Sequence, residues 1–155
     1  LVFNGGVTGA SIRGGDGTDS IYFGATASAD TISGGAGADT LVFGSMVTSS
    51  SILGGAGNDS LVFAAVQTAG STATTYYFGY DSGADTLSFG GQSSTYASLT
   101  IGYSDSYGSA ATAVSTGGGF TTYSVGGNTI LTVAGTNTAI QMVQVSQSTI
   151  TTLGG

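Results

Sequence analysis

Aspartates recur in this chain at a fixed spacing, and each one closes a glycine-rich segment. Asp19, Asp39 and Asp59 lie 20 residues apart, and each follows a Gly-Gly pair. Glycine permits positive φ and leaves backbone carbonyl oxygens uncovered, while aspartate adds a carboxylate. A hard cation such as Ca²⁺ takes about 6–8 oxygen ligands of these two kinds. The spacing therefore indicates cation binding by carbonyl and carboxylate oxygens.

The composition excludes most other chemistry. The 155 residues include eight aspartates, a single basic residue (Arg13), and no Cys, His, Pro or Trp, with a net charge of −7. Zinc sites of the usual kind, disulfides and Ser–His or Cys–His catalysis are thereby excluded. One arginine cannot neutralise several phosphates, so we expect no nucleic acid partner. The chain has no apolar run of about 20 residues, so we expect no membrane-spanning helix, and no signal peptide is visible. We also expect that the chain is not an enzyme.

An internal repeat of 20 residues organises the first half. Three similar units span 11–23, 31–43 and 51–63, and a fourth, degenerate unit (77–89) follows an insertion at 64–76. Such periodicity, with 40% hydrophobic residues, argues against disorder, and the Thr, Val, Ile, Tyr and Phe content favours strands. Residues 1–3 match the end of a unit, so we expect the chain to be a piece of a longer protein.

The segments GGDGTDSIY (14–22), GGAGADTLV (34–42) and GGAGNDSLV (54–62) resemble the calcium-binding nonapeptide of the RTX (haemolysin-type) family. The resemblance implies an all-β fold. A right-handed parallel β-roll, or solenoid, of about four 20-residue coils is expected over 1–89. Antiparallel capping strands are expected over 90–155, within the same domain.

The resemblance also implies which atoms hold the ions, because RTX ions sit between successive turns. Each ion takes carbonyls of positions two and four of one turn, carbonyls of positions one and three of the next, and both Asp carboxylates. The first expected site comprises Gly15, Gly17, Asp19, Gly34, Ala36 and Asp39. The second comprises Gly35, Gly37, Asp39, Gly54, Ala56 and Asp59. A third, with a turn that has lost its Gly pair, comprises Gly55, Gly57, Asp59, Tyr80, Ser82 and Asp85.

Electrostatics favours the same cation. Coils stacked about 4.8 Å apart place successive Asp carboxylates close together. Neighbouring charges then repel by roughly 1 kcal/mol in water and about 3 kcal/mol at an effective dielectric of 20. Calcium binding and folding should therefore be coupled. The alternative is that these aspartates only cap turns through backbone N–H groups.

The opposite half of each coil is degenerate, and Asp30 is its only acid. We therefore expect metal along one edge of the roll only. For Asp30, Asp81 and Asp105 a structural or solvated role is the favoured interpretation.

The second half predicts strands at 98–104, 120–125, 129–134 and 139–145, with a hairpin joining the middle two and a loop at 104–119. A short roll followed by such strands is similar to the C-terminal regions of serralysin-type proteases and alginate epimerases. The tyrosines are expected in the walls or core, with carbohydrate stacking as the alternative.

The leading functional hypothesis is a calcium-binding structural module of a large secreted or cell-surface protein. The low charge and the Ser, Thr and Gly content resemble RTX surface-layer proteins exported by type I secretion, which implies self-association or contact with neighbouring domains. The alternative is a C-terminal folding and secretion module of a secreted enzyme. An ice-binding roll is not expected, because turn positions three and five form no regular Thr or Asn array.

Overall fold

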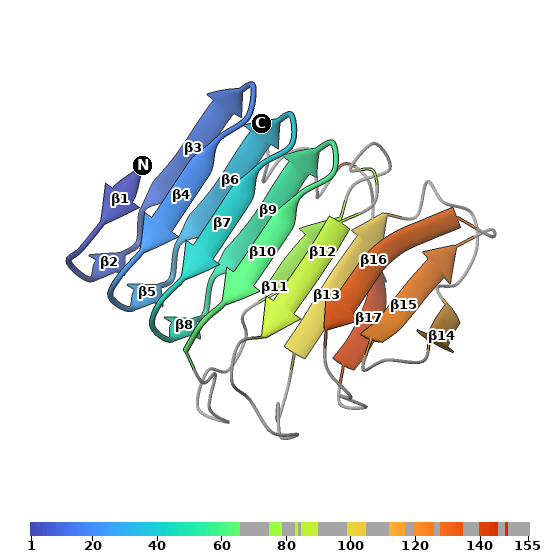
Figure 1. Cartoon of the computed structure of the whole chain (residues 1–155). Coiled ribbons are helices and arrows are strands. Elements are labelled where there is room, and N and C mark those ends of the chain that lie inside the picture. The colour runs from blue at the N-terminus through green and yellow to red at the C-terminus, as the bar shows by residue number, and fades with distance from the viewer. Residues whose placement is uncertain are drawn as a thin grey trace.

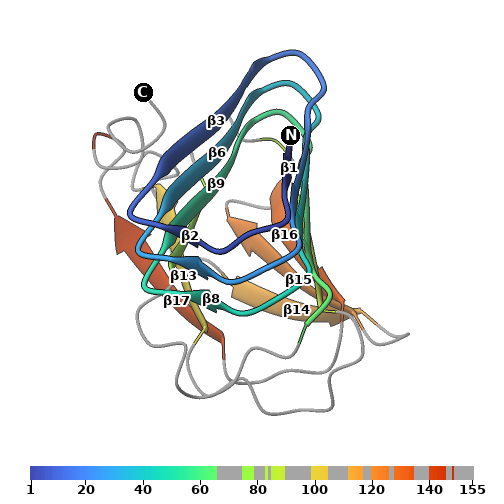
Figure 2. The same cartoon turned by 90° about the vertical axis from the view of Figure 1, so that its left-hand side faces the viewer.

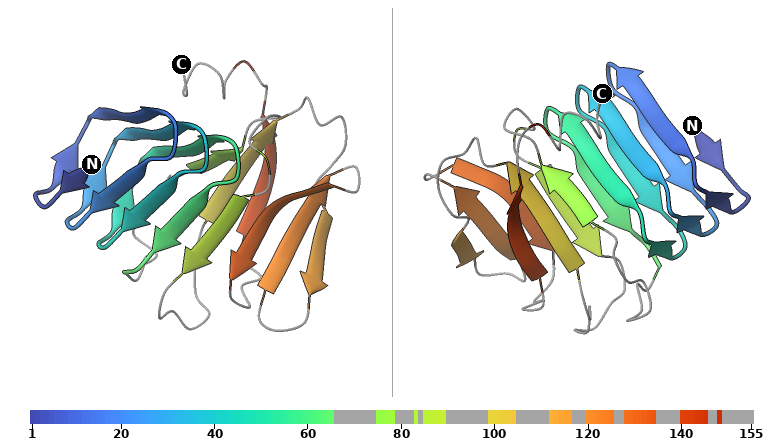
Figure 3. Two further views of the ribbon diagram at one scale, coloured as in Figure 1. Left: turned by 45° about the horizontal axis from the view of Figure 1, so that its top comes forward. Right: turned by 180° about the vertical axis from the view of Figure 1, so that it is seen from behind.

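The computed structural model describes most of the repeat region and the strands that follow it. The described residues are 1–65, 75–78, 83, 85–89, 99–104, 112–116, 120–125, 128–134, 140–145 and 148. They form an all-β fold in which coils stack at one end and the later strands lie at the other (Figures 1 and 3).

Each of the first three coils contributes a two-residue, a six-residue and a four-residue strand, after an initial strand β1 (Val2–Phe3). In chain order these strands are β2 (Val7–Thr8), β3 (Ser11–Asp16) and β4 (Ser20–Phe23), then β5 (Ala27–Ser28), β6 (Thr31–Ala36) and β7 (Thr40–Phe43), then β8 (Val47–Thr48), β9 (Ser51–Ala56) and β10 (Ser60–Phe63). Seen along the stack, the three kinds of strand form three sides of each coil (Figure 2).

The coils stack in register because the sequence repeat and the structural repeat have the same length. Ile12 pairs with Ile32 and Ile32 with Ile52 in one long sheet, whereas Leu41 pairs with Leu61 in the other. All pairing between successive coils is parallel. Strand side chains alternate between faces, so each coil directs the same residues inward. The expected parallel β-roll is confirmed.

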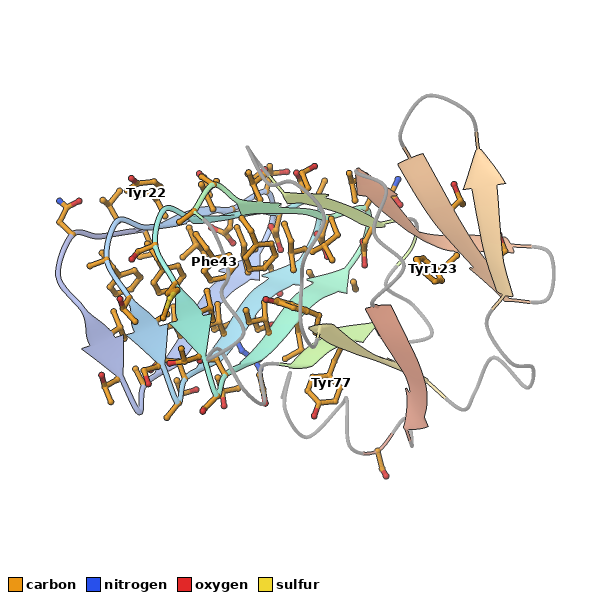
Figure 4. The ribbon with its side chains drawn as sticks, turned by 90° about the horizontal axis from the view of Figure 1, so that it is seen from below. Tyr22, Phe43, Tyr77 and Tyr123 are labelled. Atoms are coloured by element: carbon orange, nitrogen blue, oxygen red, sulfur yellow. The ribbon has the colours of Figure 1, made fainter. Side chains whose placement is uncertain are left out.

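Phenylalanines form a continuous stack through the core. The ring centroids of Phe3, Phe23, Phe43 and Phe63 are 5.0, 5.2 and 4.9 Å apart in succession, with nearly parallel planes. The Tyr76 ring meets Phe63 edge-on at 4.9 Å and ends the stack. Figure 4 shows Phe43 between the two long sheets, and Tyr22 and Tyr77 on their outer sides. The core therefore consists of like residues stacked on like.

The fourth coil keeps this register despite the insertion. Strand β11 (Thr75–Phe78) pairs with β9, and β12 (Asp85–Phe89) pairs with β10, with Leu87 opposite Leu61. Asp85 therefore occupies the position expected for the aspartate of the degenerate unit. Inserted residues 66–74 lie outside the described residues.

The strands of the second half lie where the sequence predicted them. They are β13 (Leu99–Ser104), β15 (Phe120–Val125), β16 (Asn128–Ala134) and β17 (Ile140–Val145). β15 and β16 pair antiparallel, which confirms the hairpin. The loop expected over 104–119 is wrong in part, because β14 (Thr112–Thr116) forms there and pairs with β15. Its Thr and Val residues suit a strand that adds to an exposed edge.

The expected antiparallel cap is correct for only part of this region. β15 pairs antiparallel with both β14 and β16, but β16 pairs in parallel with β12, and β13 pairs in parallel with both β11 and β17. The two long sheets therefore continue beyond residue 89 after the nonapeptide has ended. Parallel pairing requires only strands of matched length and spacing. It therefore continues along the chain beyond the last glycine-rich turn. Within the described part of the chain, no helix has the length and apolar character needed to cross a membrane.

The Phe stack provides a test of this core. Phe43 is completely buried and its ring contacts a phenylalanine on each side. Phe43→Ala is expected to destabilise the calcium-loaded protein by about 3–5 kcal/mol, because it leaves a cavity within the stack. Chemical denaturation measured by circular dichroism gives this value. Tyr22→Ala, on the outer face, is the control, and an equal loss there would contradict the proposed importance of the stack.

Candidate functional site

Turns of the sequence Gly-Gly-x-Gly-x-Asp lie along one edge of the roll, where the six-residue strand of each coil gives way to the four-residue strand. We call residues 14–19, 34–39 and 54–59 the first, second and third Gly-Asp turns. The space between the first two is the first gap, and the space between the second and third is the second gap. Figure 2 shows these turns stacked directly over one another.

Glycine is required at turn position two for two separate reasons. Gly35 has a φ of 121°, a conformation that other residues rarely adopt. A Cβ atom added to Gly35 would also collide with the carbonyl oxygen of Gly15 in the preceding coil. The Gly-Gly-x-Gly pattern thus allows the backbones of successive turns to approach closely.

Backbone carbonyls from both sides line the first gap. The carbonyl oxygens of Gly15 and Gly17 lie against the Cα positions of Gly35 and Gly37 in the second turn. The Gly34 carbonyl points back toward Gly14, and the Ala36 carbonyl accepts a hydrogen bond from the Gly17 N–H at 2.7 Å. A carbonyl has a second lone pair, so this bond leaves one available. Four carbonyls therefore face the gap between the turns.

The second gap repeats this arrangement one coil further on. The Gly35 and Gly37 carbonyls lie against Gly55 and Gly57, and the Gly54 carbonyl points back toward Gly34. The Ala56 carbonyl accepts a hydrogen bond from the Gly37 N–H at 2.7 Å. The carbonyls of Gly35, Gly37, Gly54 and Ala56 therefore face the second gap, and their role as ligands stays a prediction.

The aspartates form a ladder along the same edge. The backbone N–H of Asp19 donates to Oδ1 of Asp39 at 2.7 Å, and that of Asp39 donates to Oδ1 of Asp59 at 2.9 Å. The N–H of Asp59 donates to Oδ1 of Asp85 at 2.8 Å. Asp39, Asp59 and Asp85 are buried, whereas Asp19 is half-buried. One carboxylate oxygen of Asp39, Asp59 and Asp85 thus has the turn-stabilising role that the sequence left open as an alternative.

The other oxygen of each carboxylate has no such partner. Oδ2 of Asp19, Asp39, Asp59 and Asp85 is buried and accepts no hydrogen bond. Oδ2 of Asp39 lies 2.5 Å from where a Cβ on Gly34 would be, so glycine at position one makes room for the carboxylate. A buried polar atom without a partner is costly. These oxygens therefore require either a proton or a cation.

Without a cation, the carboxylates of Asp59 and Asp85 hold a proton more tightly than an ordinary aspartate does. The pKa of Asp59 is raised to about 6 and that of Asp85 to about 8, mainly by burial and in smaller part by the neighbouring Asp in the ladder. The N–H bond from the preceding coil lowers both pKa values, but by less than burial raises them. The ladder is thus an anionic site that lacks a positive counter-charge from a lysine, since the chain has none.

A cation here would depend mainly on backbone ligands. Among the described residues, no three Asp, Glu, His or Cys side chains converge in a way that could hold a metal. Two carboxylates and four carbonyls per gap match the hard-cation chemistry expected for calcium, which accepts carbonyl oxygens readily. The chemistry of the donor set therefore fits Ca²⁺.

The gap beyond the third Gly-Asp turn is only partly described. Gly83 lies against the Gly57 carbonyl with a φ of 72°, and Asp85 continues the ladder. The expected ligands Tyr80 and Ser82 lie outside the described residues, as do Asp81 and Asp105.

Sequence reasoning underestimated Asp30, which lies on a different edge. The residue is only 2% exposed, which excludes the solvated interpretation and supports the structural one. Its Oδ1 accepts the Ala10 N–H at 2.8 Å, and its own N–H donates to Ser50 Oγ at 3.1 Å. The 20-residue spacing of Ala10, Asp30 and Ser50 was visible in the sequence, but three different residue types concealed it.

The tyrosines are placed partly as expected. Tyr76 and Tyr123 are buried, whereas Tyr22 is 39% exposed and Tyr77 is half-buried.

The raised pKa values predict how stability depends on pH. The pKa of Asp85 is near its ordinary 3.8 in the unfolded chain but about 8 in the folded protein, so calcium-free protein should lose stability as pH rises from about 4 to 8. Asp85→Asn mimics the protonated form and keeps the acceptor oxygen. At pH 8 in chelator it should be at least about 1 kcal/mol more stable than the wild type, and at pH 4 about equal.

Thermal unfolding in chelator at several pH values measures this effect. Asp16→Asn removes the same charge from an exposed position and serves as the control. A wild-type stability that rises between pH 4 and pH 8 without calcium would contradict the prediction.

Comparison with known proteins identifies the repeats. The family model of the RTX calcium-binding nonapeptide repeat (four copies) matches residues 11–27, 25–45 and 50–64. No curated protein and no solved structure matches the chain significantly. The matched residues contain all three Gly-Asp turns, whose carbonyls and carboxylates form the two gaps. Residues 11–64 therefore carry RTX calcium-binding nonapeptide repeats, folded as a parallel β-roll.

Proposed function

We propose that this chain is a calcium-dependent structural module of a surface-layer or fibre-type assembly. RTX repeats bind calcium and form structural modules of secreted proteins, which are typically exported by type I secretion. The finer proposal concerns where the ions sit and what the folded module does. The buried, unpartnered Oδ2 atoms of the Asp ladder are the observation on which the ion positions depend.

The proposed ions lie in the gaps between Gly-Asp turns. In the first gap an ion would take the carbonyls of Gly15, Gly17, Gly34 and Ala36, with the carboxylates of Asp19 and Asp39. In the second gap it would take the carbonyls of Gly35, Gly37, Gly54 and Ala56, with Asp39 and Asp59. A third ion would use Gly55, Gly57, Asp59 and Asp85, together with Tyr80 and Ser82. One Ca²⁺ ion with its two positive charges in each gap would attract both neighbouring carboxylates and so offset their mutual repulsion.

The outer faces of the coils support an assembly role. Hydroxyl side chains recur there in register, as in the row Ser20, Thr40, Ser60 and the row Ser11, Thr31, Ser51. Among the residues of the three coils, Arg13 and Asp16 are the charged side chains that lie exposed. An uncharged, hydroxyl-covered wall packs against a neighbour without desolvating charges, which would be costly.

Counting ions tests their proposed positions. Asp39 borders both gaps, so Asp39→Ala should remove two ions from the number bound at saturation, while Asp19→Ala should remove one. Asp30→Ala, on a different edge, should remove none. Isothermal titration calorimetry supplies the stoichiometry, and Mg²⁺ should replace Ca²⁺ poorly because it prefers a smaller octahedral shell. Equal losses for Asp30→Ala and Asp39→Ala would show that metal lines both edges.

The assembly proposal has a separate test. At micromolar concentration, calcium should convert the protein from monomers into filaments or sheets visible by electron microscopy, and chelator should reverse this change. Asp39→Ala should assemble only at higher calcium concentration. A protein that folds with calcium but remains monomeric would overturn the assembly role and favour the alternative, a folding and secretion module attached to an enzyme.

A further inference from the structure

A second ladder of hydrogen bonds lies on the edge between the two-residue and six-residue strands. We call residues 9–10, 29–30 and 49–50 the Asp30 corner. The Ala10 N–H donates to Asp30 Oδ1 at 2.8 Å, and the Asp30 N–H donates to Ser50 Oγ at 3.1 Å. As in the Asp ladder, each backbone N–H donates to a side-chain oxygen of the next coil, 20 residues along the chain.

The side chains of the Asp30 corner are buried and hydrogen-bonded, and its backbone adopts an unusual conformation. Asp30 and Ser50 are 2% and 1% exposed, and the Ser50 hydroxyl also donates to the Thr48 carbonyl at 2.9 Å. The residues before them, Ala29 and Ser49, have φ values of 57° and 52°, a left-handed conformation that is costly for residues other than glycine. Interactions that hold the corner must offset this cost.

The Asp30 corner has different chemistry from the Gly-Asp turns. The carbonyls of Ala10 and Asp30 accept N–H bonds from Thr31 and Ser51, so they belong to the ladder between coils. Ser50 stands where a carboxylate would be needed to continue an anionic ladder. The corner thus links coils through hydrogen bonds and holds a single carboxylate, that of Asp30, whose Oδ2 is buried without a hydrogen-bond partner. It has no pair of carboxylates for a cation to join.

We infer that Asp30 and Ser50 are positioning residues for calcium, each holding one pair of coils in register so that the gap on the Gly-Asp edge is formed before an ion binds. Asp30 joins the first coil to the second, the pair that encloses the first gap. Ser50 joins the second coil to the third, the pair that encloses the second gap. Preorganisation of this kind raises affinity, because the cost of ordering the ligands is met in advance. The inference rests on the proposed ion positions.

The two residues should therefore act on different gaps. Asp30→Ala removes a charged acceptor and leaves the Ala10 N–H without its bond, so the calcium concentration that fills the first gap should rise about tenfold. The second gap should change by less than about twofold. Ser50→Ala should show the reverse pattern, with a smaller rise because a neutral acceptor is lost. Asp30→Asn keeps an acceptor oxygen and should restore near wild-type affinity.

Calcium titration followed by NMR of the full chain resolves the two gaps. The Gly17 amide donates across the first gap and the Gly37 amide across the second, so each reports its own midpoint. Equal shifts of both midpoints in Asp30→Ala would show general destabilisation and overturn the inference, as would no shift. A lower ion count would make Asp30 a ligand and also overturn it. If neither amide responds to calcium in the wild type, the proposed ion positions fail, and the inference fails with them.

Discussion

The first three coils stack in register and repeat most residue types every 20 positions, so a charge that recurs in the repeat is repeated along a column. Asp19, Asp39, Asp59 and Asp85 form such a column, in which Asp39, Asp59 and Asp85 each accept a backbone N–H from the coil before. Burial makes the column costlier, since it removes the water that would screen neighbouring carboxylates. A roll of this sequence is complete only when protons or cations neutralise that edge.

The same register that stacks carboxylates also stacks phenylalanines, with the opposite energetic consequence. Ring contacts at about 5 Å bury apolar surface with each added coil and need no external partner. The core therefore favours stacking under all conditions, whereas the Gly-Asp edge favours it only when neutralised. When calcium neutralises the Gly-Asp edge, the core and the edge of each coil both favour stacking.

The roll persists where its repeat is lost. Strands β13, β16 and β17 extend the two long sheets in parallel, and β15 runs antiparallel to its neighbours β16 and β14 at the end of one sheet. A solenoid end exposes unpaired backbone groups, and antiparallel strands added there move that edge away from the coils. The calcium-binding coils and the later strands thus share continuous sheets, so the order of one region is transmitted to the other through backbone hydrogen bonds.

The sequence by itself determined the repeat length, the all-β roll, the inward Phe and Ile columns and the Gly-Asp edge, because these follow from residues that recur every 20 positions. It also located the later strands and one hairpin from local propensity. Tertiary structure decided the rest. The parallel pairing of β13, β16 and β17 depends on which edges are available, and no local pattern encodes that. The burial of Asp30 depends on a corner where Ala10, Asp30 and Ser50 share a position but not a residue type, so their common role becomes visible only when the coils are stacked.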